Sequence, residues 1–202
     1  MASNRTKARF LASLMCSGLA ISGAWSGFFT APGQAQSGST APGFTIFGGV
    51  DPDFRLGYIV DNNTPRNSDA RYYLQVDSNK VERGISEIEI SYPEAFTRRP
   101  NGATLDPENI EIRVNSSRGG RNGETIPIES VTWDRESNRL EIYTQEVIPA
   151  DTEFVVALLD VRNPRRYGLH SFNLRVLYQG DVVRRYIGTW QVEVAAERPW
   201  QR

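Results

Sequence analysis

The chain has 202 residues, with 23 lysine and arginine residues against 24 aspartate and glutamate residues, and a formal net charge of −1 at pH 7. A balance this close to zero excludes the electrostatic footprint of a protein that binds nucleic acid or an anionic membrane. A single cysteine excludes a disulfide framework, and the length fits one domain behind an N-terminal extension.

The N-terminus has the layout of a secretory signal peptide. Three basic residues and no acid precede an apolar run over residues 10–29, and the small residues Gly33 and Ala35 stand at the −3 and −1 positions of a cut before Gln36. We therefore expect residues 1–35 to be removed and the protein to be periplasmic or extracellular, with no membrane span afterwards. The alternative is an uncleaved membrane anchor, although glycine and serine dilute the apolar run.

Cleavage at this position would also set the chemistry of the mature chain. Cys16 lies inside the signal, so the mature protein would have no thiol. It would carry 20 basic against 24 acidic residues, and Lys80 would be its only lysine. The expected organisation is a signal peptide, a flexible Ser/Gly/Pro-rich leader, a β-sandwich domain and a short tail, at residues 1–35, 36–43, 44–197 and 198–202.

The rest of the chain is organised around residues 124–156. Apolar side chains recur at almost every second position in Ile126, Ile128 and Val131, and a polar turn follows. The run FVVALL that begins at Phe154 is continuous enough for a strand buried on both faces. Strand, turn, strand, turn, strand is therefore expected here.

Similar alternation of apolar and polar residues predicts further strands on both sides of this stretch. The segment 115–123, NSSRGGRNG, has the composition of a mobile hairpin loop, and Pro107 begins a short helical turn. Turn signals at short spacing predict an all-β fold, a single Ig-like antiparallel β-sandwich of about seven to nine strands. The remaining expected strands cover residues 44–47, 54–60, 71–76, 85–90, 110–114, 169–178 and 182–194.

Several short motifs in this region resemble those of one known family. They are Ala70-Arg-Tyr-Tyr-Leu-Gln-Val, Asp106-Pro-Glu-Asn-Ile110, Val147-Ile-Pro-Ala150 and above all Val161-Arg-Asn-Pro164 followed by Gly168 and Phe172. The chain resembles exported cyanobacterial proteins that are called only domain of unknown function 2808. The resemblance covers most of the mature chain and implies an exported or envelope protein, but it brings no catalytic residue across. A looser likeness is to bacterial Ig-like sandwiches.

The sequence offers no catalytic residues, and the protein is not expected to be an enzyme. His170 is the only histidine and stands among apolar strand residues, so it is interpreted as structural. Glu87 and Glu89 face the same way on a strand, as a glycosidase pair could. We expect them instead to form a solvated face paired with Arg113 or another cross-strand cation. A carboxylate-based hydrolase is the least favoured alternative.

No cofactor or metal site is expected either. Zinc and copper sites need several histidine, cysteine or methionine ligands, and the mature chain has one histidine and none of the others. The acidic pairs Asp51 with Asp53 and Asp134 with Glu136 are too sparse for a calcium loop.

The remaining candidates for a binding site are arginines that lie near expected loops. The tentative contact residues for a ligand or partner are Arg118, Arg121, Arg162, Arg165 and Arg166. If they share one surface, they could bind an anionic polysaccharide or an acidic envelope protein. The competing interpretation is scattered surface ion pairs. Trp133 and Trp190 are assigned to core packing rather than to sugar stacking. The expected function is thus that of a non-enzymatic binding or structural component of the cell envelope.

Overall fold

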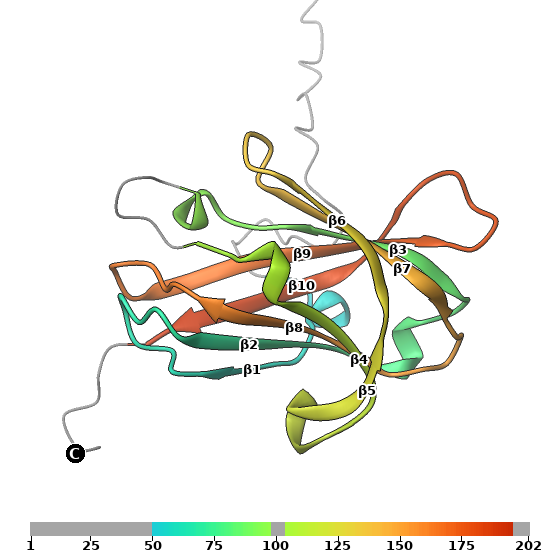
Figure 1. Ribbon diagram of the computed structural model, residues 1–202, viewed down its shortest axis with the longest axis horizontal. Helices are drawn as coiled ribbons and strands as arrows, with labels where there is room; N and C mark the ends of the chain where they lie inside the picture. The colour runs from blue at the N-terminus through green and yellow to red at the C-terminus, as the bar shows by residue number, and fades with distance from the viewer. Residues whose placement is uncertain (1–49, 98–103, 196–202) are drawn as a thin grey trace, which may run out of the picture. The chain divides into compact units, whose positions relative to one another are not determined.

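The computed structural model describes residues 50–97 and 104–195, and everything reported below refers to these residues (Figure 1). The expected signal peptide, the leader and the strand at residues 44–47 lie outside the described residues, as does the tail after residue 197. The domain boundaries therefore stay predictions. Within the described ranges, no helix has the length and apolar character needed to cross a membrane.

The described strands form two five-stranded antiparallel sheets, which confirms the predicted β-sandwich. The first sheet has the order β1-β2-β8-β4-β5, and the second has the order β10-β9-β3-β7-β6. The strands are β1 (Tyr58–Asp61), β2 (Ala70–Val76), β3 (Ile85–Ser91), β4 (Ile110–Ser117), β5 (Asn122–Ile126), β6 (Ile128–Asp134), β7 (Arg139–Ile148), β8 (Phe154–Val161), β9 (Gly168–Tyr178) and β10 (Arg185–Val194).

The described helices are short 3-10 turns between strands. The one at residues 107–109 confirms the helical turn predicted from Pro107, and Asp106 caps it by accepting a hydrogen bond from the backbone N–H of Glu108 (3.0 Å). The five turns are η1 (Pro52–Phe54), η2 (Ser78–Lys80), η3 (Glu94–Phe96), η4 (Pro107–Asn109) and η5 (Arg118–Gly120).

The segment around Pro127 belongs to both sheets. Ile126 pairs with Ile112 at the edge of the first sheet, whereas Ile128 pairs with Thr144 at the edge of the second. Proline has no N–H to donate to a ladder, so the chain changes sheets at this residue. Figure 1 shows the unbroken ribbon from β5 into β6. One strand of the predicted pattern is therefore two, and the residues that the structure describes contain ten strands where about seven to nine were predicted.

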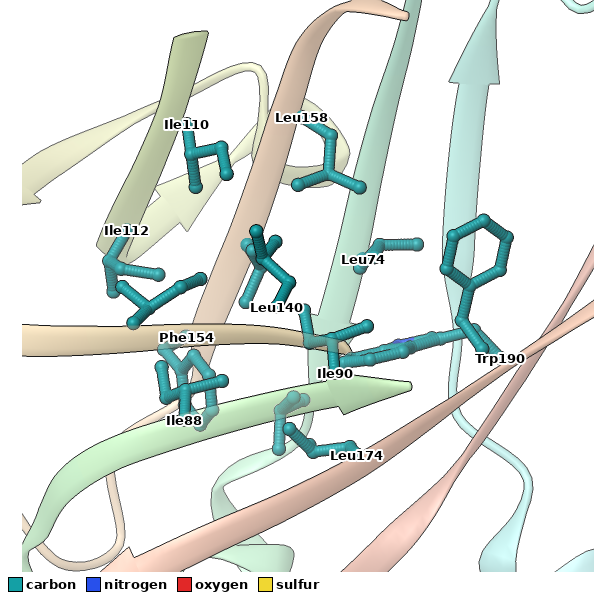
Figure 2. Close-up of a cluster of buried hydrophobic side chains, with 14 of the residues drawn as sticks. Leu74, Ile88, Ile90, Ile110, Ile112, Leu140, Phe154, Leu158, Leu174 and Trp190 are labelled. Carbon is teal, nitrogen blue, oxygen red and sulfur yellow. The ribbon is translucent and has the colours of Figure 1, made fainter. Parts of the chain in front are cut away.

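The core lies between the two sheets (Figure 2). Leu74, Phe154 and Ile112 from the first sheet face Ile88 and Leu140 from the second, and all five are fully buried. Burial of apolar surface at about 25 cal/mol per Å² supplies the main stabilising free energy of such a core.

Trp190 from β10 crosses the core and is itself fully buried. Its indole N–H donates to the backbone carbonyl of Gln75 on β2 (2.8 Å), so the side chain links both layers and keeps its polar atom satisfied. Its predicted role in core packing agrees with this position.

The outer face of the first sheet carries a second, smaller apolar cluster. Tyr73, Val155 and Ala157 are buried there, beneath the η5 segment. The Arg121 guanidinium lies over the Tyr73 ring, with its carbon 5.5 Å from the ring centroid. Residues 115–123 form the predicted hairpin connection between β4 and β5, and its mobility stays a prediction. The pattern did not reveal that β4 extends to Ser117 and that Gly120 is buried against Val155 of β8.

Candidate functional site

Four exposed arginines come together at one end of the sandwich, here called the arginine end: Arg66, Arg162, Arg165 and Arg166. Three of them lie in the loop between β8 and β9 and are among the five tentative contacts predicted from the sequence. The fourth lies in the loop between β1 and β2. Figure 1 shows these two loops at the same end of the two sheets.

One buried side chain, Asn163, connects the two loops through hydrogen bonds. It is 2% exposed, and its amide Nδ2 donates to the carbonyls of Asn62 (3.1 Å) and Thr64 (2.9 Å). Its Oδ1 accepts from the Tyr72 hydroxyl (2.6 Å), and its backbone N–H donates to the carbonyl of Asn67 (2.8 Å). The asparagine of the Val161–Pro164 motif thus forms hydrogen bonds with the backbone of a loop about a hundred residues away in the sequence.

The same motif places the arginines around this buried contact. The N–H of Arg66 donates to the carbonyl of Pro164 (3.0 Å), next to Arg165 in the chain. Arg162 forms an isolated antiparallel bridge with Thr104, with two backbone hydrogen bonds of 3.0 and 3.1 Å. Arg66 was not predicted, because its loop could be recognised only as polar. Its backbone is left-handed (φ 64°), and an arginine residue does not indicate such a conformation.

The other two tentative contacts lie elsewhere. Arg118 is the first residue of η5, and its side chain lies outside the part of the chain that the structure describes. Arg121 follows η5 and forms an ion pair with Asp61, and its hydrogen bond lowers the pKa of that carboxyl below its ordinary value. Asp61 precedes Asn62, one of the partners of Asn163, so this ion pair connects Arg121 to the β1–β2 loop of the arginine end.

The carboxylates tested for hydrolase chemistry are held in an ion-pair cluster on the outer face of the second sheet. Arg184 reaches from the β9–β10 hairpin to Glu87 (3.0 Å), Glu89 (3.1 Å) and Glu141 (3.1 Å). Glu89 is 3% exposed, so the predicted solvated face was wrong at this residue. The expected partner Arg113 was wrong, but the alternative, another cross-strand cation, is confirmed. Arg175 of β9, directly opposite Glu89, and Arg139 of β7 each have a guanidinium nitrogen 3.8 Å from a carboxylate oxygen of Glu89.

Arg113 instead pairs with Glu111 on its own strand, on the outer face of the other sheet. Arg184, which contacts all three glutamates, comes from a hairpin and could not be predicted from cross-strand alternation. Arg175, by contrast, stands directly opposite Glu89 on β9.

The remaining candidates have structural roles. His170 is partly buried with its ring edge-on to Phe96 (5.4 Å between centroids), and burial lowers the pKa of the imidazole. Asp51 accepts the N–H of Asp53 (3.0 Å), and Asp134 accepts that of Glu136 (2.9 Å), so both carboxylates order turns. Among the described residues, no group of three or more His, Cys, Asp or Glu side chains is placed to hold a metal ion.

These features define an all-β sandwich with an arginine-bearing end and a buried asparagine behind it. The model of the family described as "Protein of unknown function (DUF2808)" matches residues 44–194, and the chain therefore belongs to this family. The match includes the Val161–Pro164 motif that positions the arginine end, and it confirms the resemblance seen in the sequence. No curated protein matches the chain.

Solved structures that are similar to this chain include surface proteins of bacteria. The collagen-binding domain of a Staphylococcus aureus adhesin is 12% identical, with 68% of this chain and 95% of that chain covered and a TM-score of 0.38. BslA, a bacterial hydrophobin, is 13% identical, with 73% and 98% covered and a TM-score of 0.43. The collagen-binding domain of the Erysipelothrix rhusiopathiae surface protein RspB is 16% identical, with 69% and 46% covered and a TM-score of 0.36.

Proposed function

We propose that the protein is an exported, non-enzymatic binding module of the cell envelope, and that its arginine end contacts an anionic polysaccharide. The observation that carries the proposal is the buried Asn163, which holds the two arginine-bearing loops in one place. Guanidinium groups bind carboxylate and sulfate groups through paired hydrogen bonds, and a fixed backbone reduces the entropy lost on binding.

The surroundings of the titratable groups support a role without catalysis. Glu87 and Glu89, the pair that could resemble a glycosidase site, are both bound by Arg184. Both carboxylates therefore already bind a cation of the chain itself. His170 is partly buried with its ring against Phe96, and no carboxylate among the described residues is hydrogen-bonded to it to orient it as a base. Export is supported by the three-part layout of the first 35 residues.

An acidic envelope protein is the second candidate ligand. Tyr167 and Leu169 directly follow the arginines and are 74% and 59% exposed. Aromatic and arginine side chains together are characteristic of protein–protein interfaces, whereas an apolar leucine contributes little to binding a charged polymer.

The proposal is tested with dextran sulfate as the anionic probe and neutral dextran as its control. We expect dextran sulfate to bind, and the variant Arg162→Ala/Arg166→Ala to lose about tenfold in affinity at low salt, since two charge-assisted contacts are removed. The matched control is Arg83→Ala/Arg185→Ala, which removes two exposed arginines beside Tyr178, at the other end of β9. Affinities are measured by titration calorimetry at two salt concentrations.

The outcomes separate the candidates. Equal losses in the two double variants would mean that charge alone attracts the polymer, and they would contradict a specific site. Affinity that does not fall with salt would also contradict it. If dextran sulfate does not bind but Leu169→Ser abolishes capture of an acidic envelope protein, the second candidate replaces the first.

A further inference from the structure

A hollow of about 480 Å³ lies beside the arginine end, between the β6–β7 hairpin and the η4 segment. Thr104, which pairs with Arg162, lines it, as does Asp160 two residues before that arginine. Its size falls in the range of sites for small ligands or single side chains. The lining residues that matter here are Asp106, Glu108, Trp133, Arg135 and Asp160.

Trp133 forms one wall of this hollow and already has a cation on its face. Its indole N–H donates to the Tyr92 hydroxyl, which fixes the orientation of the ring. The guanidinium carbon of Arg135 lies 3.9 Å from the ring centroid. An indole face attracts a cation through its quadrupole, most strongly where water is partly excluded. The assignment of Trp133 to core packing is therefore incomplete, because the ring is only partly buried and its outer part faces the hollow.

The polar part of the lining is mainly acidic. Three carboxylates, from Asp106, Glu108 and Asp160, line the hollow against one arginine, Arg135. Asp106 and Asp160 are held in place, since both accept from the side-chain amide of Asn109 at 3.1 Å. The described lining thus has a formal charge of −2, and this charge favours a positively charged occupant.

We propose that this hollow binds a cationic side chain, an arginine or a lysine, that a partner protein presents. Arg135 already makes such a cation–π contact with Trp133 within the chain. The side chain of the partner would replace Arg135 on the ring, and the carboxylates would neutralise the charge of the bound side chain. An organic cation fits better than a metal ion, because no group of three acidic side chains among the described residues converges closely enough to ligate one. This site is distinct from the arginine end, and either proposal can fail without the other.

The probe is a blocked peptide, Gly-Gly-Arg-Gly-Gly, added to the full chain, with Gly-Gly-Gln-Gly-Gly as its uncharged control. The indole N–H resonance of Trp133, identified by its loss in Trp133→Phe, reports on binding by nuclear magnetic resonance. We expect saturable shifts of this resonance with the arginine peptide alone. The resonance of the buried Trp190 should not move, which checks that the fold is intact.

Two variants with opposite effects distinguish this site from non-specific attraction. Glu108→Gln/Asp160→Asn should weaken binding about tenfold, since it removes two charges from the lining. Arg135→Ala should strengthen binding about two- to fivefold, because the internal competitor leaves the ring. The matched control is Glu146→Gln/Asp151→Asn, in which both residues are exposed and Asp151 has a left-handed backbone like that of Asp160 (φ 55° and 52°).

Three results would overturn the proposal: no saturable shift of the Trp133 resonance, an equal loss in the control variant, or weaker binding after Arg135→Ala. Maltotriose, a neutral sugar, is tested as a second probe. A saturable shift with this neutral sugar and none with the arginine peptide would assign the hollow to a glycan instead.

Discussion

At the scale of single residues, Asn163 fixes the relative position of the two loops that carry the arginines. It is a buried polar side chain whose donors and acceptor all have partners, so its interactions specify one arrangement of two loops. Tyr72 depends on it in turn. Burial raises the pKa of the Tyr72 hydroxyl above its ordinary value, and this hydroxyl has Asn163 as its hydrogen-bond acceptor.

Replacing Asn163 by alanine should therefore lower the free energy of unfolding by about 3 kcal/mol, because buried polar groups on both loops lose their partners. Tyr72→Phe should cost about 1–2 kcal/mol for the same reason. The double variant should lose less than the sum of the two, since the two side chains share one hydrogen bond. Urea denaturation measures all three values, and strict additivity would show that the bond contributes nothing.

At the scale of elements, the η5 turn packs on the outer face of the first sheet and covers part of its apolar cluster. Gly120 adopts a left-handed backbone (φ 90°) and lies directly over the buried Val155 of β8. A Cβ at this position would come within 2.7 Å of a Val155 methyl carbon, closer than real contacts allow. The turn can approach the sheet only because the residue has no side chain.

A matched pair of substitutions separates backbone strain from packing. Gly180 in the β9–β10 hairpin has nearly the same φ (87°), but a Cβ there would meet nothing within 4 Å. We expect Gly180→Ala to cost about 1–2 kcal/mol for the left-handed backbone alone. Gly120→Ala should cost about 1–3 kcal/mol more, from overpacking against Val155. Thermal or urea unfolding of both variants gives the difference, and equal costs would mean that η5 moves away freely.

The elements were more predictable than their connections. Alternation in residues 85–90 and 110–114 identified β3 and β4, and the continuous run at Phe154 identified a central strand buried on both faces, because periodicity is a local property of the chain. The change of sheet at Pro127 and the packed η5 turn depend on long-range pairing. The sequence pattern therefore predicted one strand where two exist, and it did not reveal that Gly120 of η5 is buried against β8.

The same distinction applies to the candidate sites. Arg162, Arg165 and Arg166 are neighbours in the sequence and could be selected as a group, whereas Arg66 joins them only through the backbone contact with Pro164. The hollow beside Trp133 combines residues from separate elements, so no local pattern revealed it.

At the scale of the whole molecule, two surfaces of opposite charge adjoin at one end of the sandwich. The arginine end is basic, while the hollow beside it has an excess of two acidic charges among its described lining residues. Arg162 is joined to the hollow through its backbone pairing with Thr104. A ligand at one surface therefore experiences the charge of the other, over distances comparable to the Debye length of about 8 Å in physiological salt.

This proximity predicts an indirect effect of the arginine end on the hollow. Arg162→Ala/Arg166→Ala removes positive charge beside the site, so the arginine peptide should bind about two- to fourfold more tightly at low ionic strength, as expected for two charges roughly 10 Å away in water. At 0.5 M salt the gain should disappear, because the Debye length falls to about 4 Å. Arg83→Ala/Arg185→Ala, at the opposite end of β9, should leave the affinity unchanged at both salt concentrations. Titration of the Trp133 indole resonance in the three proteins measures the effect. A gain that persists in high salt would indicate a rearrangement of the loop, and an equal gain in the control would indicate that net charge, not the proximity of the two surfaces, sets the affinity.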